Sequence, residues 1–219
     1  MAIISSDQSV LREIPLKITG VSESIYAGFW SRFGAMLLDA IIITPVVFLI
    51  IFMNGLGKDI FWYTVIPHIF FSIWYHVYLP KTYGGTPGKL LINITIIRID
   101  GAPIGWREAA LRHIVDFTLM LLTLIVTMVA LTEANEETYV SLGWMERTQY
   151  LKSLTPVSSS LLYWLSNIWG LSEFIVLLTN ERKRALHDYM AGTVVVRSEY
   201  VIKIREVMTT DEGQGQLVY

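Results

Sequence analysis

Residues 34–53 read Gly-Ala-Met-Leu-Leu-Asp-Ala-Ile-Ile-Ile-Thr-Pro-Val-Val-Phe-Leu-Ile-Ile-Phe-Met, and Asp39 is the one charged residue among them. About 20 apolar residues in a helix cross the hydrocarbon core of a bilayer, so this stretch predicts a transmembrane span. A carboxylate inside such a helix costs about 2.5–3.5 kcal/mol on insertion scales. We therefore expect Asp39 to point into the protein rather than at lipid.

The composition of the whole chain supports a membrane location. Its 219 residues are 53% hydrophobic and 16% charged, with a mean hydropathy of +0.49. A soluble domain typically carries about 25% charged residues. The net charge of −2 gives no sign of a nucleic-acid binder. Because the chain has no cysteine, disulfides, thiolate catalysis and cysteine-bound metals are excluded.

Four apolar stretches have the length of membrane spans, which predicts an α-helical membrane protein with four transmembrane helices. They cover residues 34–53, 60–79, 109–131 and 157–179. The first two form a helical hairpin, and loops 80–108 and 132–156 separate the others. We divide the chain into an N-terminal segment (1–24), a membrane domain (25–200) and a C-terminal tail (201–219).

The basic residues predict the orientation of these spans, because loops rich in lysine and arginine stay in the cytoplasm. Three of the 17 basic residues precede the first span, five lie between the second span and the first turn of the third, and six follow the fourth span. We therefore expect both termini and loop 80–108 on the cytoplasmic side of the cell inner (cytoplasmic) membrane. The residues counted are Arg12, Lys17, Arg32; Lys81, Lys89, Arg98, Arg107, Arg112; and Arg182, Lys183, Arg184, Arg197, Lys203, Arg205.

Some segments outside the spans carry structure signals of their own. Residues 90–100 and 193–204, and more weakly residues 10–19, alternate β-branched and polar side chains. All three fall on the predicted cytoplasmic side, so we expect a small cytoplasmic β element. The polar segment 133–156 is expected outside, with an amphipathic helix near residues 140–151.

Ionisable residues in or next to the spans are the candidate site. Asp39 and Arg32 are seven residues apart, about 10 Å along a helix, which is too far for a relaxed contact. We therefore expect Arg32 to pair with Asp188, just after the fourth span, and Asp39 to find another partner or to titrate. Arg112 and Asp116 have i,i+4 spacing and can pair on one helix. The remaining candidate is Glu173.

Two roles for this network remain open from the residues alone. Buried membrane carboxylates usually mark ion or substrate paths. The same charges can instead neutralise each other and hold helices together.

The chain has few signs of an enzyme or a metal site. It contains neither Gly-x-Ser-x-Gly nor His-Glu-x-x-His. His68 and His76 are eight residues apart and fall on different helix faces, which does not suit a metal pair. We expect no enzyme activity, no cofactor and no metal, although His187-Asp188 near the headgroups keeps a lipid-modifying enzyme as a third alternative.

Three segments together resemble the RDD family of bacterial membrane proteins. They are Tyr26-Ala-Gly-Phe-Trp-Ser-Arg-Phe-Gly-Ala-Met-Leu-Leu-Asp39, Gly85-Thr-Pro-Gly-Lys89 with the strand after it, and Arg184-Ala-Leu-His-Asp-Tyr-Met-Ala-Gly-Thr-Val-Val-Val196. The family is named for one arginine and two aspartates. Arg32 and Asp39 match the first two, and the second aspartate matches Asp188, with Asp116 as a rival. The long segment 133–156 departs from the commoner short form of the family.

The resemblance implies a small membrane domain that is usually considered transport-related, and some members resemble cation/proton antiporters. Our first hypothesis is exchange of protons for monovalent cations, with Asp39 taking up and releasing the ion in a homodimer. The alternative is a scaffold or accessory subunit that binds a partner through its cytoplasmic face.

Overall fold

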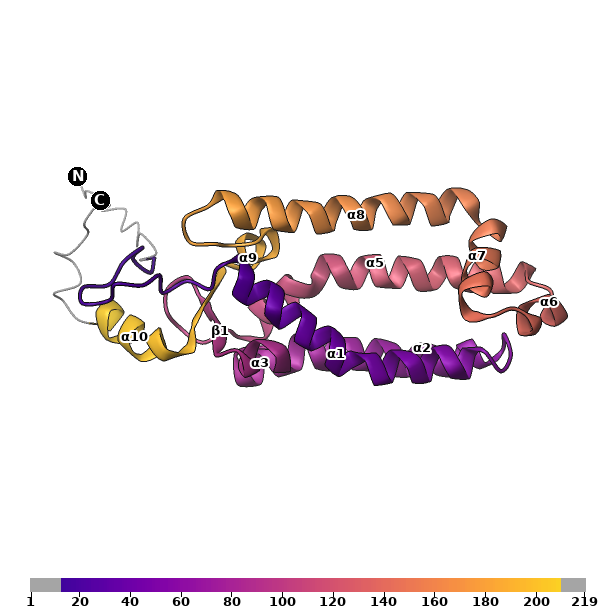
Figure 1. Ribbon diagram of the computed structural model, residues 1–219, viewed down its shortest axis with the longest axis horizontal. Coiled ribbons are helices and arrows are strands. Elements are labelled where there is room, and N and C mark those ends of the chain that lie inside the picture. The colour runs from indigo at the N-terminus through magenta and orange to yellow at the C-terminus, as the bar shows by residue number, and fades with distance from the viewer. Residues whose placement is uncertain (1–12, 210–219) are drawn as a thin grey trace, which may run out of the picture.

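The computed structural model describes residues 13–209, most of which are helical. The long helices are α1 (Phe29–Asn54), α2 (Ile60–Ile73), α5 (Trp106–Glu133) and α8 (Pro156–Thr179). They run along the long axis of the molecule, with α5 between α8 and the pair α1 and α2 (Figure 1).

Short elements gather at the two ends of this bundle (Figure 1). At one end, called here the sheet end, lie β1 (Ile94–Arg98), β2 (Thr193–Arg197), α3 (Leu79–Tyr83), α4 (Pro87–Leu91), α9 (Leu186–Ala191), the 3-10 helix η2 (Ser198–Tyr200) and α10 (Val201–Thr209). At the opposite end lie α6 (Glu136–Ser141) and α7 (Trp144–Leu154).

Three of the long helices, α1, α5 and α8, are long and apolar enough to cross a membrane. They contain the predicted spans 34–53, 109–131 and 157–179. The predicted span 60–79 is not among the three, because α2 has 14 residues and a π-helical segment, η1 (Trp74–Tyr78), follows it. The elements α2, η1 and α3 nevertheless follow one another directly from Ile60 to Tyr83.

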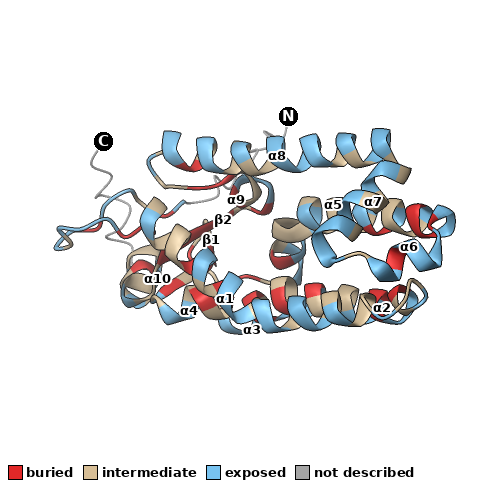
Figure 2. Cartoon of the chain, turned by 45° about the vertical axis from the view of Figure 1, so that its right-hand side comes forward, coloured by how far each residue is buried: buried red, intermediate tan, exposed pale blue. Residues whose placement is uncertain are grey.

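Few residues of the long helices are buried, as the sparse red along α1 and α8 in Figure 2 shows. Phe48, Phe70 and Trp164 are each more than 60% exposed, and α8 has Leu177 as its buried residue. A water-soluble protein rarely exposes apolar surface on this scale, whereas lipid tails solvate it well. This surface agrees with a membrane protein.

The two strands form an antiparallel sheet in which Ile96 lies opposite Val195. The chain just before α1 pairs with β2 as well, because the backbone N–H of Ala27 donates to the carbonyl oxygen of Val195 at 2.9 Å. Since β1 follows α4 and β2 follows α9, the sheet holds the ends of α1, α4 and α9 together.

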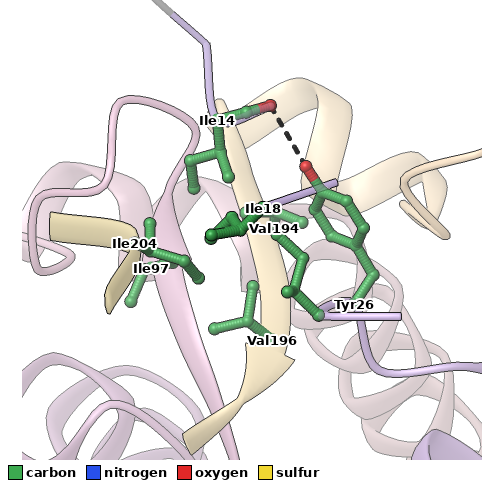
Figure 3. Packing of buried hydrophobic residues seen from close by; sticks show 8 residues of the cluster. Ile14, Ile18, Tyr26, Ile97, Val194, Val196 and Ile204 are labelled. Atoms are coloured by element: carbon green, nitrogen blue, oxygen red, sulfur yellow. Dashed lines mark hydrogen bonds between the residues drawn. The ribbon is translucent and has the colours of Figure 1, made fainter. Parts of the chain in front are cut away.

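A small apolar core stabilises the sheet end (Figure 3). Val194 and Val196 of β2 pack with Ile14, Ile97 and Ile204, all at most 1% exposed. Tyr26 closes this core and donates its hydroxyl to the carbonyl oxygen of Ile14 at 3.1 Å. These residues come from segments far apart in the sequence, so the core joins both ends of the described chain.

The predicted strands are too long. Leu90 and Leu91 belong to α4, because Thr86 and Pro87 occupy the N-cap and first position of a helix, where proline is favoured. The second strand ends at Arg197, since apolar residues spaced by three and four, at Val201, Ile204 and Met208, form one face of α10.

The weaker strand prediction at residues 10–19 lies partly outside the described residues, and residues 13–19 form no strand. The chain still contacts the sheet there, because the Ile14 N–H donates to the Ile99 carbonyl oxygen at 2.9 Å. The helix predicted near residues 140–151 is divided between α6 and α7, with Gly143 as the N-cap of α7.

Candidate functional site

The first group of polar residues, the Asp188 cluster, joins three helices at the sheet end. Arg32 at the start of α1 donates through Nη1 to Asp188 Oδ2 at 2.6 Å. Arg112 of α5 donates through Nη1 to Asp188 Oδ1. Asp188 itself is fully buried, and both arginine side chains are at most 10% exposed. One carboxylate therefore ties α1 and α5 to α9.

Local structure around α9 positions Asp188. Its Oδ2 accepts the N–H of Ala185 at 2.9 Å, which satisfies a donor at the start of the helix. Thr193, the first residue of β2, donates its hydroxyl to Oδ1 at 3.2 Å. Between them Gly192 ends α9 with φ +63°, a left-handed conformation that glycine adopts without strain.

The charges around Asp188 keep it ionised. Burial alone would raise its pKa, but the guanidinium groups of Arg112 and Arg32 outweigh burial and hold the pKa of Asp188 well below its usual value. The carboxylate therefore carries its charge at physiological pH. Such a group stores no proton near neutrality, so it suits a fixed ion pair better than proton exchange.

His187 and Glu173 extend this cluster toward α8. Glu173 Oε1 accepts the N–H of His187 at 3.0 Å, and Oε2 lies 2.5 Å from the Nδ1 atom of His187. The Nε2 atom of His187 lies 2.9 Å from Arg112 Nη2. A guanidinium can only donate, so Nε2 is the acceptor in this contact, and Nδ1 is the ring nitrogen next to Glu173.

The second group, the Asp39 cluster, surrounds a carboxylate that is 8% exposed. Asp39 Oδ1 accepts the hydroxyl of Tyr75 at 2.6 Å and the backbone N–H of Gly88 at 2.7 Å. Its Oδ2 accepts the hydroxyl of Thr86 at 2.6 Å. These donors come from η1 and from α4 with its N-cap residue Thr86, so Asp39 holds α1 against both elements. None of its hydrogen-bond partners within residues 13–209 is basic.

Gly88 sets the approach of α4 to α1. A Cβ atom at this position would lie 2.3 Å from the carbonyl oxygen of Ala35 and 2.7 Å from Asp39 Cγ. Real Cβ atoms do not come this close to backbone atoms, so only glycine allows the observed contact. Lys89 follows it, half-buried, and donates to Thr86 Oγ1 at 3.2 Å.

Replacing Tyr75 by phenylalanine should lower the free energy of unfolding by about 1.5–3 kcal/mol, because the buried carboxylate of Asp39 loses a charge-assisted donor. Thermal unfolding in detergent, followed by circular dichroism, measures the change. Tyr63→Phe on α2 is the matched control, since Tyr63 is 77% exposed. Equal shifts in the two variants would contradict a specific role for the Tyr75 hydroxyl.

The π-helical segment η1 also brings two histidines together. His76 of η1 stacks on His113 of α5, with ring centroids 4.6 Å apart. His113 Nε2 lies 3.0 Å from the hydroxyl of Ser72 on α2. The extra residue in a π-turn rotates the side chains that follow it, and such turns are frequent at functional sites. Here Tyr75 contacts α1 and His76 contacts α5.

A groove of about 370 Å³ lies between α5 and α8, with α7 at one end, and its lining mixes apolar side chains with hydroxyl groups. A second hollow of about 390 Å³ shares Thr123 and Ser166 with it and adds His68, Asp116 and Trp169. Asp116 Oδ1 accepts the indole N–H of Trp169 at 3.0 Å. The two hollows adjoin at Thr123 and Ser166, one beside α7 and the other beside Asp116. The groove is lined by Thr123, Val126, Thr127, Ala130, Thr148, Leu151, Lys152, Thr155, Ser159, Leu162, Tyr163 and Ser166.

The family model described as the RDD family matches residues 26–192 of this chain. The chain belongs to the RDD family. The match covers most of the predicted membrane domain 25–200 and contains both buried carboxylates. No curated protein and no solved structure gives a significant match.

The geometry separates the residues that give the RDD family its name. The expected pair between Arg32 and Asp188 is present, and Asp39 has partners of its own. Arg112 contacts Asp188 rather than Asp116, so the i,i+4 pair expected on α5 is replaced by a contact between α5 and α9. Contact with Arg32 favours Asp188 over Asp116 as the second aspartate of the family name.

Several residues of the RDD protein's clusters were not expected from the sequence. Thr86 and Gly88 lie in the Gly85–Lys89 motif, for which no contact with Asp39 was predicted, and Tyr75 was one aromatic residue among many in its span. A signal existed for α4, since Thr-Pro is a typical helix start. The stacking of His76 on His113 had no sequence signal, because it depends on how η1 meets α5.

Proposed function

We propose that this protein exchanges protons for a monovalent cation across the membrane, along the path between α5 and α8, with Asp116 as the titrating carboxylate. The observation that carries the proposal is the pair of adjoining hollows, one beside α7 and one beside Asp116, between two helices long enough to span a membrane. Carboxylates that face such a path in a membrane are functional candidates by default.

Two threonine hydroxyls of α5 in the groove suit cations, while Lys152 in the same lining carries a positive charge. Thr123 donates its hydroxyl to the carbonyl oxygen of Leu119 at 2.8 Å, and Thr127 donates to that of Thr123 at 2.8 Å. Each hydroxyl donates its one proton to a carbonyl oxygen of α5. It therefore presents only oxygen lone pairs, which are acceptors, to the groove. Lone pairs bind a metal cation or a proton donor, and they repel anions.

Asp116 suits the role of carrier better than Asp39. Asp39 receives three donors and binds α1 to two other elements, so an entering ion would have to displace them. Asp116 accepts a side-chain hydrogen bond from Trp169 and lines a hollow beside His68. In this proposal Asp39 and Asp188 hold the helices, and Asp116 moves the ion.

The proposal includes the arrangement in the membrane. The run α2–η1–α3 serves as a further span beside α1, α5 and α8. The sheet end with its basic residues faces the cytoplasm, and α6 and α7 face outward. Since α8 has Leu177 as its buried residue, a second copy of the chain can pack on its open face in a homodimer.

Purified protein in liposomes with an internal pH dye tests the exchange. We expect a gradient of Na⁺, K⁺ or Li⁺ to drive proton movement in wild type and not in Asp116→Asn. Asp100→Asn, a change at a partly exposed carboxylate in the turn after β1, is the control that should keep the flux.

Two results would overturn this assignment. Undiminished flux in Asp116→Asn would remove Asp116 from the mechanism, and Asp39→Asn would then be the variant to compare. Absence of flux in folded wild type with each of the three cations would contradict cation/proton exchange.

One observation favours a second candidate, a scaffold without transport. The carboxylates of Asp39 and Asp188 both serve as joints between elements, as structural ties would. In that case the sheet end binds a partner protein. Folded wild type would then show no flux, and loss of the sheet end would release the partner.

A further inference from the structure

Two levels of polar contact join α5 and α8, and the second lies one helical turn from Asp116 toward the sheet end. At the first level, Asp116 Oδ1 accepts the indole N–H of Trp169 at 3.0 Å. Glu173 follows Trp169 by four residues on α8, so it lies on the same helix face about 6 Å further along the axis. On α5, Arg112 precedes Asp116 by four residues and lies at the level of Glu173.

His187 of α9 connects the two helices at the second level, because α9 lies against the ends of both (Figure 1). Its Nε2 atom lies 2.9 Å from Arg112 Nη2, and its Nδ1 atom lies 2.5 Å from Glu173 Oε2. Glu173 Oε2 is buried and has no hydrogen-bond partner within residues 13–209. This oxygen therefore has lone pairs that can bind a proton.

The other charged groups at this level keep their protonation state. Asp188 Oδ1 lies 3.8 Å from His187 Nε2, and Asp188 stays ionised because of its arginine partners. The charge of Glu173 also acts on Arg32. Arginine does not lose its proton in proteins, which fixes the charge of both Arg32 and Arg112. His187 and Glu173 are therefore the groups at this level that can exchange a proton.

The hollow beside Asp116 reaches toward this pair. Its lining includes Trp169 and Gly170, which lie four and three residues before Glu173 on α8. A Cβ atom at Gly170 would have no neighbour within 4 Å, so the space beside it is open. A polar hollow of about 390 Å³ is large enough for water, and one water molecule can carry a proton between two groups. Glu173 and His187 are also close enough to affect Asp116 electrostatically.

The opposite side of the pair meets solvent. The His187 side chain is 25% exposed at the sheet end, whereas that of Glu173 is 16% exposed. Glu173 therefore lies between a group that solvent reaches and the hollow beside Asp116.

We propose that Glu173 and His187 carry the exchanged proton between Asp116 and the solvent at the sheet end. This inference rests on the exchange proposed above, in which Asp116 binds the cation. It adds the route by which the proton enters and leaves.

The route can be written as a series of bond changes. His187 Nε2 takes a proton from solvent, so both ring nitrogens carry one. The new N–H ends the contact with Arg112 and faces Asp188. The N–H bond at Nδ1 then breaks as an O–H bond forms on Glu173 Oε2, and the proton passes through water to the carboxylate of Asp116 as the cation leaves. The reverse series releases the proton when a cation binds.

Two exchange measurements on the full chain in liposomes test this route. Glu173→Gln keeps the size of the side chain and an acceptor for the backbone N–H of His187, but it cannot take up a proton. We expect its cation-driven proton flux to fall about tenfold or more, the usual effect of removing a proton-transferring group. Exchange of labelled Na⁺ or Rb⁺ across the membrane for the same unlabelled ion needs Asp116 but no proton, so it should continue at the wild-type rate.

Three further variants make the test specific. Glu181→Gln, at an exposed carboxylate just after α8, is the matched control and should leave both exchanges unchanged. Glu173→Asp retains a carboxyl group and should retain most of the proton flux. His187→Gln should lose proton flux and keep exchange of the labelled cation.

The failure of this route differs from the failure of the exchange itself. Wild-type proton flux in Glu173→Gln or in His187→Gln would overturn the route and leave the exchange standing. Equal loss of both exchanges in Glu173→Gln would also overturn it, because the residue would then support the fold or the cation site. Absence of proton flux in wild type would overturn the exchange and the route together.

Discussion

Replacing Asp188 by asparagine is expected to lower the free energy of unfolding by about 3–5 kcal/mol, the usual cost of breaking a buried ion pair from one side. The change leaves Arg32 and Arg112 charged and buried beside a neutral amide. Asparagine also replaces one carboxylate oxygen by an NH2 group, which can only donate. At the Oδ2 position this group would face the donors of Arg32 and Ala185. At the Oδ1 position it would face the donors of Arg112 and Thr193. The loss should therefore exceed that of an ordinary hydrogen bond.

Asp100→Asn is the matched control for this prediction. Asp100 pairs with Arg98 at 2.7 Å, but both side chains are more than a quarter exposed, so the loss should stay within about 1 kcal/mol. Chemical unfolding in detergent, followed by circular dichroism, compares the two variants. Similar losses at the two positions would show that the Asp188 cluster contributes no more than a surface pair.

The pH dependence of the same comparison follows from the lowered pKa of Asp188. Its pKa in the folded protein lies well below 3.8, the ordinary value. The contribution of this group to stability is therefore complete above about pH 4 and is lost as the pH falls through the folded-state pKa. The difference between wild type and Asp188→Asn should be constant from neutral pH to about pH 4 and shrink below it.

The ion pair of Arg32 with Asp188 could be predicted from the sequence because helix geometry excludes the alternative pair of Arg32 with Asp39. Seven residues along one helix separate Arg32 from Asp39 by a fixed distance, and Asp188 lies on the same predicted side as Arg32, just after the last span. The long helices could be predicted for a similar reason, since apolar length alone indicates them. Both inferences depend on local spacing.

The partners of Asp39 could not be predicted in this way. Tyr75, Thr86 and Gly88 lie 36, 47 and 49 residues from Asp39 and reach it because η1 and α4 pack on α1. That packing depends on a π-turn and on one short helix, and neither has a strong sequence pattern. The predicted end of the second strand was wrong for a related reason. The β-branched residues of α10 fit a strand, but they also fit a helix with one buried face.

Replacing Gly88 by alanine is expected to separate α4 from α1 and to lower the free energy of unfolding by about 1–3 kcal/mol or more, as for other overpacked positions. The new Cβ atom would overlap the carbonyl oxygen of Ala35, which belongs to a helix backbone and cannot rotate away. Any shift of α4 that relieves this overlap also removes the N–H of Gly88 and the hydroxyl of Thr86 from Asp39. The buried carboxylate would then keep one donor, Tyr75.

Gly34→Ala on α1 separates this overlap from a general effect of removing glycine. A Cβ atom at Gly34 has no neighbour within 4 Å, and alanine favours a helix by about 1 kcal/mol over glycine. Thermal unfolding should therefore show a lower midpoint for Gly88→Ala and an unchanged or higher one for Gly34→Ala. If Gly88→Ala unfolds like wild type, α4 does not pack on α1 through this contact, and Asp39 lacks the two donors that argue against its role as an ion carrier. In that case the flux measurements would have to treat Asp39 and Asp116 as equal candidates, which makes this single substitution a test of the assignment to Asp116 as well.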